Sequence, residues 1–297
     1  MLCAKIPATS ANLGPGFDCL GLALNLFNTI TVEESSTWEI RLTGKYNMGL
    51  PIDESNLVWQ TMLHLWEKVN YPTPKITLTL ENEIPPARGL GSSSAAIVGG
   101  LVIANSLAGT PFSQLELLQM ANELEGHPDN VTPALYGGVT LAVETATGIL
   151  PRVLRENSHV EVLVVIPEFL LNTSKSRKVL SSQVPRPDAV FNIAHAGLLI
   201  EAFIRGDFTL LKEGMRDHLH QEQRAALVPG LSEALSSALD NGAYGAALSG
   251  SGPTLLAFLT SEHTHAVANG MIQTFTKHGL SAQAYPLQIS PLGAHLF

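Results

Sequence analysis

Apolar and polar residues alternate with a period of two in several segments of the first half of the chain, namely residues 5–25, 28–34, 37–44 and 75–85. This period is typical of strands whose two faces meet different surroundings. A glycine-rich stretch interrupts the first of these segments. The pattern predicts an antiparallel or mixed sheet in the first half of the chain.

Three helices are predicted in the same half. Apolar residues recur with a helical period over residues 56–69, and residues 95–107 form an apolar run typical of a buried helix. Residues 113–124 begin at Ser113 and carry Glu116 three positions later, which is the capping-box pattern of a helix start.

The second half predicts strand, helix, strand, strand, helix, strand, with further helical segments after the first helix. The expected strands are residues 160–166, 244–248, 254–259 and 281–289, and the expected helices are residues 188–205, 208–226, 231–241 and 261–278. This order is typical of a split βαβ, ferredoxin-like domain. Because the pattern breaks over residues 147–158, we expect an α+β fold with two domains, residues 1–155 and 156–297.

Composition indicates a folded protein with a sizeable core. Of 297 residues, 45% are hydrophobic and 14% are charged, and the net charge is −9 with only 17 Lys and Arg. Nucleic-acid surfaces need clustered basic residues, and a membrane span needs roughly 18 apolar residues in a row. Cys3 and Cys19 lack the spacing of a disulfide framework or a zinc site. We expect a cytoplasmic protein with no nucleic-acid or membrane partner.

The segment PPARGLGSSSA, residues 85–95, lies between a predicted strand and a predicted helix. Gly89 and Gly91 permit positive φ and the close approach of a ligand, while the serines after them are preferred helix N-caps. The unpaired N–H groups of the helix start would face the glycines and favour an anion such as phosphate. A plain turn that caps a core helix fits the same residues, so the loop alone leaves both interpretations open.

Three well-known motifs do not fit this loop. A Walker-A loop needs a lysine where Ser92 stands, and the dinucleotide-binding fingerprint needs a third glycine where Ser94 stands. A nucleophile elbow centred on Ser93 fails at Ala95. A P-loop enzyme and a serine hydrolase are therefore disfavoured.

A second glycine-rich segment, SGSGP at residues 249–253, lies between two predicted strands. Gly, Ser and Pro mark a hairpin turn, and the alternation of glycine with serine also leaves N–H groups free for an anion-binding nest. Both interpretations stay open.

Three segments follow one another across nearly the whole chain: PATSANLGPGFD at residues 7–18, the loop at residues 85–95, and GAALSGSGPT at residues 245–254. In this order they resemble the motifs of the GHMP small-molecule kinases, named for galactokinase, homoserine kinase, mevalonate kinase and phosphomevalonate kinase. HPDNVTPALYGG, TSKSRKVL and DHLHQEQR, which begin at residues 127, 173 and 217, resemble the homoserine kinase family within that superfamily.

The resemblance implies an N-terminal domain related to a ribosomal-protein fold, a ferredoxin-like C-terminal domain, and an active site between them. It implies transfer of a phosphoryl group from ATP to the hydroxyl of L-homoserine, in the threonine branch of amino-acid synthesis. It also implies a homodimer.

The implied ATP site is the loop, whose main-chain amides would wrap the phosphates. Its residues are Pro85, Pro86, Ala87, Arg88, Gly89, Leu90, Gly91, Ser92, Ser93, Ser94 and Ala95. Ser93 or Ser92 could place a hydroxyl near Mg²⁺, a hard cation that takes oxygen ligands, and the resemblance implies Glu123 as the metal carboxylate. The short loop before His127 leaves Glu125 as the alternative carboxylate.

The acceptor is a zwitterion, so its site needs a cation for the carboxylate and an anion or amide for the ammonium group. The matched positions are Arg177 and Arg224 for the carboxylate, Asn12 and Asp18 for the ammonium group, and Asn130 for the hydroxyl.

Asp129 is the candidate catalytic base, at a position where mevalonate kinase relatives usually carry one. A scheme without a dedicated base stays open, because early removal of the hydroxyl proton contributes little when the transition state of phosphoryl transfer is loose. Other functions also stay open: a GHMP kinase acting on mevalonate or a sugar, an inactive nucleotide-binding regulator, and an acidic protein-interaction domain.

Overall fold

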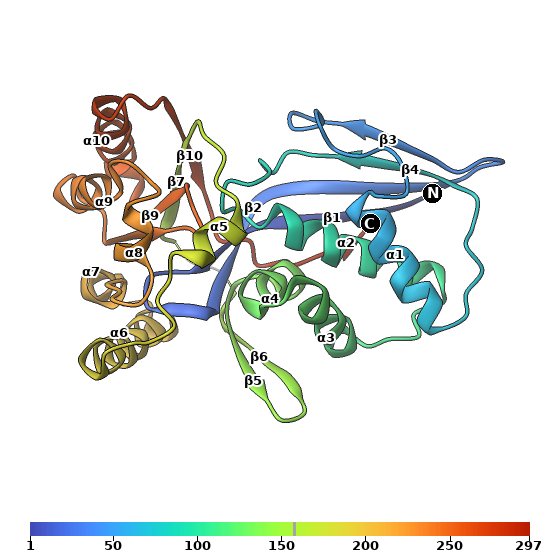
Figure 1. Cartoon of the computed structure of the whole chain (residues 1–297), viewed down its shortest axis with the longest axis horizontal. Helices are drawn as coiled ribbons and strands as arrows, with labels where there is room; N and C mark the ends of the chain where they lie inside the picture. The colour runs from blue at the N-terminus through green and yellow to red at the C-terminus, as the bar shows by residue number, and fades with distance from the viewer. Residues whose placement is uncertain (157–158) are drawn as a thin grey trace.

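A computed structural model describes residues 1–156 and 159–297. Figure 1 shows two lobes, each with its own sheet, and the short helix α5 (Thr173–Lys178) at their junction. The two termini both lie in the first lobe (Figure 1). Cys3 and Cys19 are both free thiols.

The first lobe is built on one sheet. Its strands are β1 (Leu2–Asn12), β2 (Gly16–Glu34), β3 (Glu39–Thr43), β4 (Ile76–Glu81), β5 (Val139–Thr145), β6 (Gly148–Arg155) and β11 (His295–Leu296). The order is β11-β1-β2-β4-β3, while β5 pairs with β2 and with β6. The 19 residues of β2 allow it to pair with β5 at one end and β4 at the other. Only β3 and β4 run parallel among the described pairs.

Four helices belong to this lobe: α1 (Leu57–Lys68), α2 (Ser92–Leu107), α3 (Gln114–Glu125) and α4 (Pro128–Tyr136). The predicted capping box of Ser113 and Glu116 is present at α3. The start of α2 corrects the expectation of a serine cap, because its N-cap is Gly91 in the left-handed conformation and no side chain caps it. The serines form the first turn of the helix instead.

The second lobe has the predicted order of elements. Its strands are β7 (Glu161–Pro167), β8 (Gly245–Leu248), β9 (Leu255–Leu259) and β10 (Ala282–Leu287). They form an antiparallel sheet in the order β10-β7-β9-β8, that is fourth, first, third, second, as a split βαβ arrangement requires. The helices are α6 (Arg186–Arg205), α7 (Leu211–Gly214), α8 (Gln221–Ala225), α9 (Leu231–Asp240) and α10 (Thr264–Lys277), with 3₁₀ turns at Phe208–Leu210 and Ser261–His263.

The expected break over residues 147–158 is largely a strand, since β6 forms a hairpin with β5. The chain passes to the second sheet between Arg155 and Glu161, and residues 157–158 of the expected break lie outside the described residues. The C-terminus then returns to the first sheet, where β11 pairs with β1 and Ile289 bridges to Leu24. The last residues therefore complete the first lobe rather than the second domain that the sequence predicted.

By length and mean hydropathy, α6 is the one helix in the described ranges that could span a membrane. It buries Leu199, Ala202 and Phe203 in a hydrophobic core that also contains β1 and β2 residues such as Ile6 and Leu22. One apolar core thus extends from the first lobe into the second and fixes the lobes against each other.

Candidate active site

A cavity of about 270 Å³ lies where the two lobes meet, at the N-terminal end, or mouth, of α2. It is lined by Asn12, Asp18, Ala87, Arg88, Gly89, Leu90, Gly91, Ser92, Ser93, Glu125, His127, Asp129, Asn130, Asn172, Thr173, Arg177, Arg224, Gly250 and Ser251. All three glycine-rich segments found in the sequence therefore contribute to one cavity.

The loop before α2 is held at close range by its neighbours. A Cβ on Gly91 would lie 1.8 Å from Thr9 Oγ1, and one on Gly89 would lie 2.3 Å from the carbonyl oxygen of Ser249. Both glycines also have positive φ, which a side chain would strain. Thr9 N–H donates to the carbonyl of Leu90 at 3.1 Å. The loop thus lies fixed between β1 and the turn after β8, and only glycine fits at these two positions.

The mouth of α2 presents free main-chain donors. The first bond of the helix runs from Ala95 N–H to the carbonyl of Gly91 at 2.8 Å. Within the described residues, the N–H groups of Ser92, Ser93 and Ser94 have no recorded partner, and no side chain caps the helix. Because the N-terminus of a helix also carries partial positive charge, this mouth suits a phosphate.

The other predicted loop residues have different surroundings. The Arg88 side chain donates to the carbonyl of Phe169 at 2.7 Å, which ties the loop to the segment after β7. Pro86 and Ala95 line a second, neighbouring cavity, and Pro85 is buried and lines neither of the two. Ser94 is buried behind the cavity wall.

The carboxylate next to this mouth is Glu125, not Glu123. Ser93 and Ser94 donate their hydroxyl protons to the two oxygens of Glu125, at 2.9 and 2.8 Å. Glu125 is the last residue of α3, which ends at Gly126 in the left-handed conformation. Glu123 is exposed and does not line the cavity. A step of two residues along a helix turns the side-chain direction by about 200°, so Glu123 and Glu125 point to different sides of α3. The placement favours Glu125, the alternative carboxylate, over Glu123 as the candidate metal ligand.

Two residues at the start of α4 form a hydrogen-bonded pair. His127 Nδ1 lies 2.6 Å from Asp129 Oδ1, and Asp129 is buried. Burial lowers the pKa of His127, but the hydrogen bond to Asp129 and the charge of that carboxylate outweigh it, so the pKa is raised overall. Next to them, Thr9 donates its hydroxyl proton to Asn130 Oδ1 at 2.8 Å, which orients the Asn130 amide.

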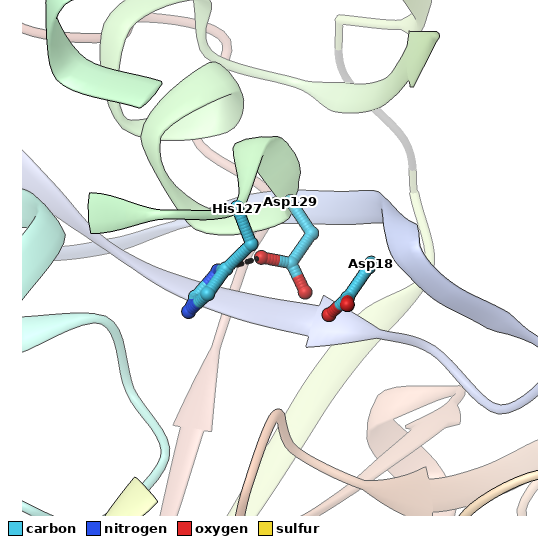
Figure 2. Close-up of side chains that lie close together, drawn as sticks. All are labelled: Asp18, His127 and Asp129. Atoms are coloured by element: carbon cyan, nitrogen blue, oxygen red, sulfur yellow. Dashed lines mark hydrogen bonds and ion pairs between the residues drawn. The ribbon is translucent and has the colours of Figure 1, made fainter. Parts of the chain in front are cut away.

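Figure 2 shows Asp129 between His127 and Asp18. One potential ligand atom from each of the three lies within 4.8 Å of the others, which is close enough for all three to contact one metal ion. Asp18 is already paired with Arg177, and His127 Nδ1 is bound to Asp129. Because Mg²⁺ prefers oxygen ligands, the hydroxyl of Ser93 with the carboxylate of Glu125 fits that ion better. The facing carboxylates of Asp18 and Asp129 suit an ammonium group instead.

Asp18 and Arg177 contact each other, although the sequence predicts separate roles for them. Arg177 donates from Nη1 and Nη2 to the two carboxylate oxygens, at 3.0 and 2.6 Å, and this hydrogen bonding raises the pKa of Arg177. Asn12 uses its amide nitrogen to donate to the Gly250 carbonyl and its amide oxygen to accept from Asp18 N–H, each at 3.1 Å. Asn12 therefore holds Asp18 in place with both of its polar atoms.

Arg224 is 2% exposed yet lines the cavity. It lies 5.5 Å from the centre of the Phe17 ring, and Arg177 lies 5.6 Å from the same centre. Burial, followed by the charge of Arg177, lowers the pKa of Arg224 to about 10, so the guanidinium stays charged at neutral pH. The two arginines predicted for a carboxylate thus share one wall.

Several residues that line or support the cavity escaped the sequence analysis. Asn172 and Thr173 lie at the start of α5, and Thr173 Oγ1 is 3.2 Å from Ser251 Oγ. In the sequence, the only indication was that Thr173 begins the segment TSKSRKVL and that Asn172 directly precedes it. Thr9 lies within the first motif, but nothing in its residue type indicated a contact with Asn130.

A second cavity, of about 250 Å³, shares Ala87, Ser92 and Ser93 with the first. Its wall is mostly apolar, with three amide side chains among its residues. The lining residues are Asn28, Thr29, Ile30, Leu50, Pro51, Asn56, Leu57, Val58, Leu80, Asn82, Pro86, Ala87, Ser92, Ser93, Ala95 and Ala96. A planar, partly polar group attached to a phosphate at the α2 mouth would reach it.

Comparison with known proteins defines the class. The model of the GHMP kinases N terminal domain matches residues 56–138, and the model of the GHMP kinases C terminal domain matches residues 199–277. The fold is that of a small-molecule kinase of this class, as the sequence predicted.

Similar full-length proteins define the family. The chain is 53% identical to a homoserine kinase of Desulfitobacterium hafniense over 99% of both chains, and 43% identical to one of Microchaete diplosiphon over 97% of this chain and 95% of that one. A solved homoserine kinase of Cytophaga hutchinsonii superposes with a TM-score of 0.88 at 29% identity, covering 100% of this chain and 97% of that one. A putative homoserine kinase of Listeria monocytogenes gives 0.80 at 34% identity, covering 100% and 99%. The chain belongs to the homoserine kinase family.

Proposed function

We propose that the chain transfers the γ-phosphoryl group of ATP to the side-chain hydroxyl of L-homoserine, giving O-phospho-L-homoserine for threonine biosynthesis. The observation that carries the proposal is one cavity that joins an anion-binding helix mouth to a wall with Asp18, Arg177 and Arg224. Family membership and the relatives at up to 53% identity support the same reaction. The family resemblance also supports a homodimer, and the composition supports a cytoplasmic location.

The helix mouth is the proposed phosphate site. The free N–H groups of Ser92, Ser93 and Ser94 would donate to phosphate oxygens, and the second cavity would take the nucleoside. Main-chain donors fixed in advance cost no reorganisation when charge moves during transfer. Ser93 and Glu125 would hold Mg²⁺, which neutralises charge on the phosphates when bound.

The acceptor site is proposed on the opposite wall. The carboxylate of homoserine would accept from Arg224 and Arg177, while Asp18 would accept from its ammonium group. Charge-assisted hydrogen bonds of this kind are about twice as strong as neutral ones. A paired cation and anion also matches a zwitterion better than it matches a neutral sugar.

The hydroxyl is proposed to meet Asn130, whose amide is oriented by Thr9. Asp129 would receive the hydroxyl proton as the phosphoryl group arrives, and its hydrogen bond to His127 would hold the carboxylate in place. Because the transition state of phosphoryl transfer is loose, orientation contributes more than early proton removal.

The test is an acceptor panel. Purified protein with MgATP is assayed for ADP release with homoserine, threonine, mevalonate and galactose. We expect kcat/KM to be highest for homoserine, by about 10³-fold over mevalonate and galactose, because an acceptor without both charges cannot bind both Arg224 Nη2 and the Asp18 carboxylate. A preference for another acceptor would contradict the proposal, and no ADP release with any acceptor would favour an inactive regulator.

A further inference from the structure

Arg224 is held by three hydrogen bonds from inside the protein. Its Nε donates to the carbonyl of Ser176 at 3.3 Å, and its Nη1 donates to the carbonyl of Gly250 at 2.9 Å and to His220 Nδ1 at 3.2 Å. Across residues 1–156 and 159–297, no partner is recorded for Nη2. Since Arg224 lines the cavity, Nη2 is the nitrogen left for a ligand.

The contacts of His220 fix its tautomer. A guanidinium only donates, so Nδ1 must be the unprotonated nitrogen that accepts from Arg224. Nε2 then carries the proton and donates to the carbonyl of Gly14 at 2.9 Å. The imidazole thus bridges α8 to the loop between β1 and β2, which leads directly to Asp18.

The surroundings of His220 keep it neutral. The side chain is fully buried, and the centre of its ring lies 5.3 Å from that of the Phe17 ring. Burial lowers its pKa, and the charge of Arg224 lowers it further, against the opposing charges of Asp217 and Asp18. Asp217 accepts from the N–H groups at residues 219, 220 and 221 and from the Asn192 amide, so its charge is satisfied without the imidazole.

From these contacts we infer that His220 is a positioning residue for acceptor binding. Its unprotonated Nδ1 fixes one terminal nitrogen of Arg224 and thereby aims the other, Nη2, at the carboxylate of the acceptor. Its Nε2–H holds the loop that leads to Asp18. The inference deepens the proposed function and depends on it, because the carboxylate in question is that of homoserine.

Two substitutions separate the two bonds of the ring. His220→Asn places an amide oxygen near the position of Nδ1 and keeps an acceptor for Arg224, while it loses the contact with Gly14. His220→Gln places an amide N–H near the position of Nε2 and keeps the bond to Gly14, while Arg224 loses its acceptor. Both remove the same ring from the same buried place, so each is the other's control for packing.

Each variant is assayed for KM and kcat with homoserine and with ATP, and for its Tm. We expect His220→Gln to raise the KM for homoserine about 10-fold and His220→Asn to raise it less than about 3-fold, since a hydrogen bond to a charged group is among the stronger ones. The KM for ATP is expected to stay within about 2-fold in both, because the hydrogen bonds of the ring go to Gly14 and Arg224 and not to the loop before α2.

Equal KM values for homoserine in the two variants, or KM values that follow Tm alone, would overturn the inference and leave His220 a packing residue. The wild-type protein in the same assay keeps this result distinct from a failure of the proposed function. Homoserine turnover by the wild type with equal variants rejects the role of His220, whereas a wild type that does not use homoserine rejects the function itself.

Discussion

Replacing Arg224 with methionine is expected to lower kcat/KM for homoserine about 10³-fold, because truncating one partner of a buried, hydrogen-bonded charge costs several kcal/mol. The change removes the donor to the substrate carboxylate. It also leaves the Ser176 carbonyl and His220 Nδ1 without their side-chain donor, while the Gly250 carbonyl keeps the one from Asn12. The KM for ATP is expected to stay within about 3-fold, since Arg224 lies on the acceptor wall of the cavity.

Arg216→Met is the matched control. Arg216 is about half exposed and pairs with Glu213 at 3.0 Å, so the substitution removes the same charge and adds the same side chain outside the site. Its kcat/KM is expected within about 2-fold of the wild type, because exposed ion pairs contribute little. An Arg224→Met enzyme with unchanged kcat/KM for homoserine would show that the carboxylate binds elsewhere.

Replacing Glu125 with glutamine is expected to lower kcat about 10²-fold at saturating ATP, which is the usual cost of one charged group that acts on the transition state. Glutamine keeps an oxygen that accepts from Ser93 or Ser94 but carries no charge for Mg²⁺. The Mg²⁺ concentration needed for half-maximal rate is expected to rise, so kcat should recover in part at high Mg²⁺. Titration of Mg²⁺ at fixed ATP measures both effects.

Glu123→Gln is the matched control for Glu125→Gln. Glu123 is exposed and two residues away on the same helix, so its substitution makes the same chemical change outside the cavity. Activity and Mg²⁺ dependence are expected to equal those of the wild type. Loss of activity in Glu123→Gln with an active Glu125→Gln would reverse the assignment of the metal carboxylate.

Much of the fold could be predicted because local patterns and tertiary packing agree. The α+β class is confirmed, and the strand order of the second lobe is the one that a split βαβ arrangement, predicted from the order of elements along the chain, requires. The capping box at Ser113 was predictable because its two bonds are local. Family membership was predictable because three long motifs occur in a fixed order.

Long-range contacts explain what the sequence did not reveal. Gly91 rather than a serine caps α2 because Thr9 occupies the space beside it, and Thr9 lies 82 residues earlier on β1. The return of β11 to β1 joins the two ends of the chain and carries no periodic signal in two residues. Both contacts join residues that are far apart in the chain, so a local sequence pattern cannot predict them.

The contacts between residues of the candidate site could not be predicted from the sequence either. Residue types and motif matches indicated Asp18, Arg177 and Arg224, yet the sequence treated them as independent ligands. The structure pairs Asp18 with Arg177 across 159 residues and places a neutral imidazole behind Arg224. The choice between Glu123 and Glu125 depended on where α3 ends, and helix boundaries are the least reliable part of a sequence prediction.

The central claim is that main-chain amides at the mouth of α2 hold the triphosphate while Asp18 and two guanidinium groups hold a free amino acid beside it. The most direct measurement is a crystal structure with Mg²⁺, a non-hydrolysable ATP analogue and homoserine. The account predicts phosphate oxygens within about 3.2 Å of the N–H groups of Ser92 to Ser94, and the homoserine carboxylate at the same range from Arg224 Nη2. Phosphates bound away from this helix mouth, or a carboxylate that does not touch Arg224, would contradict it.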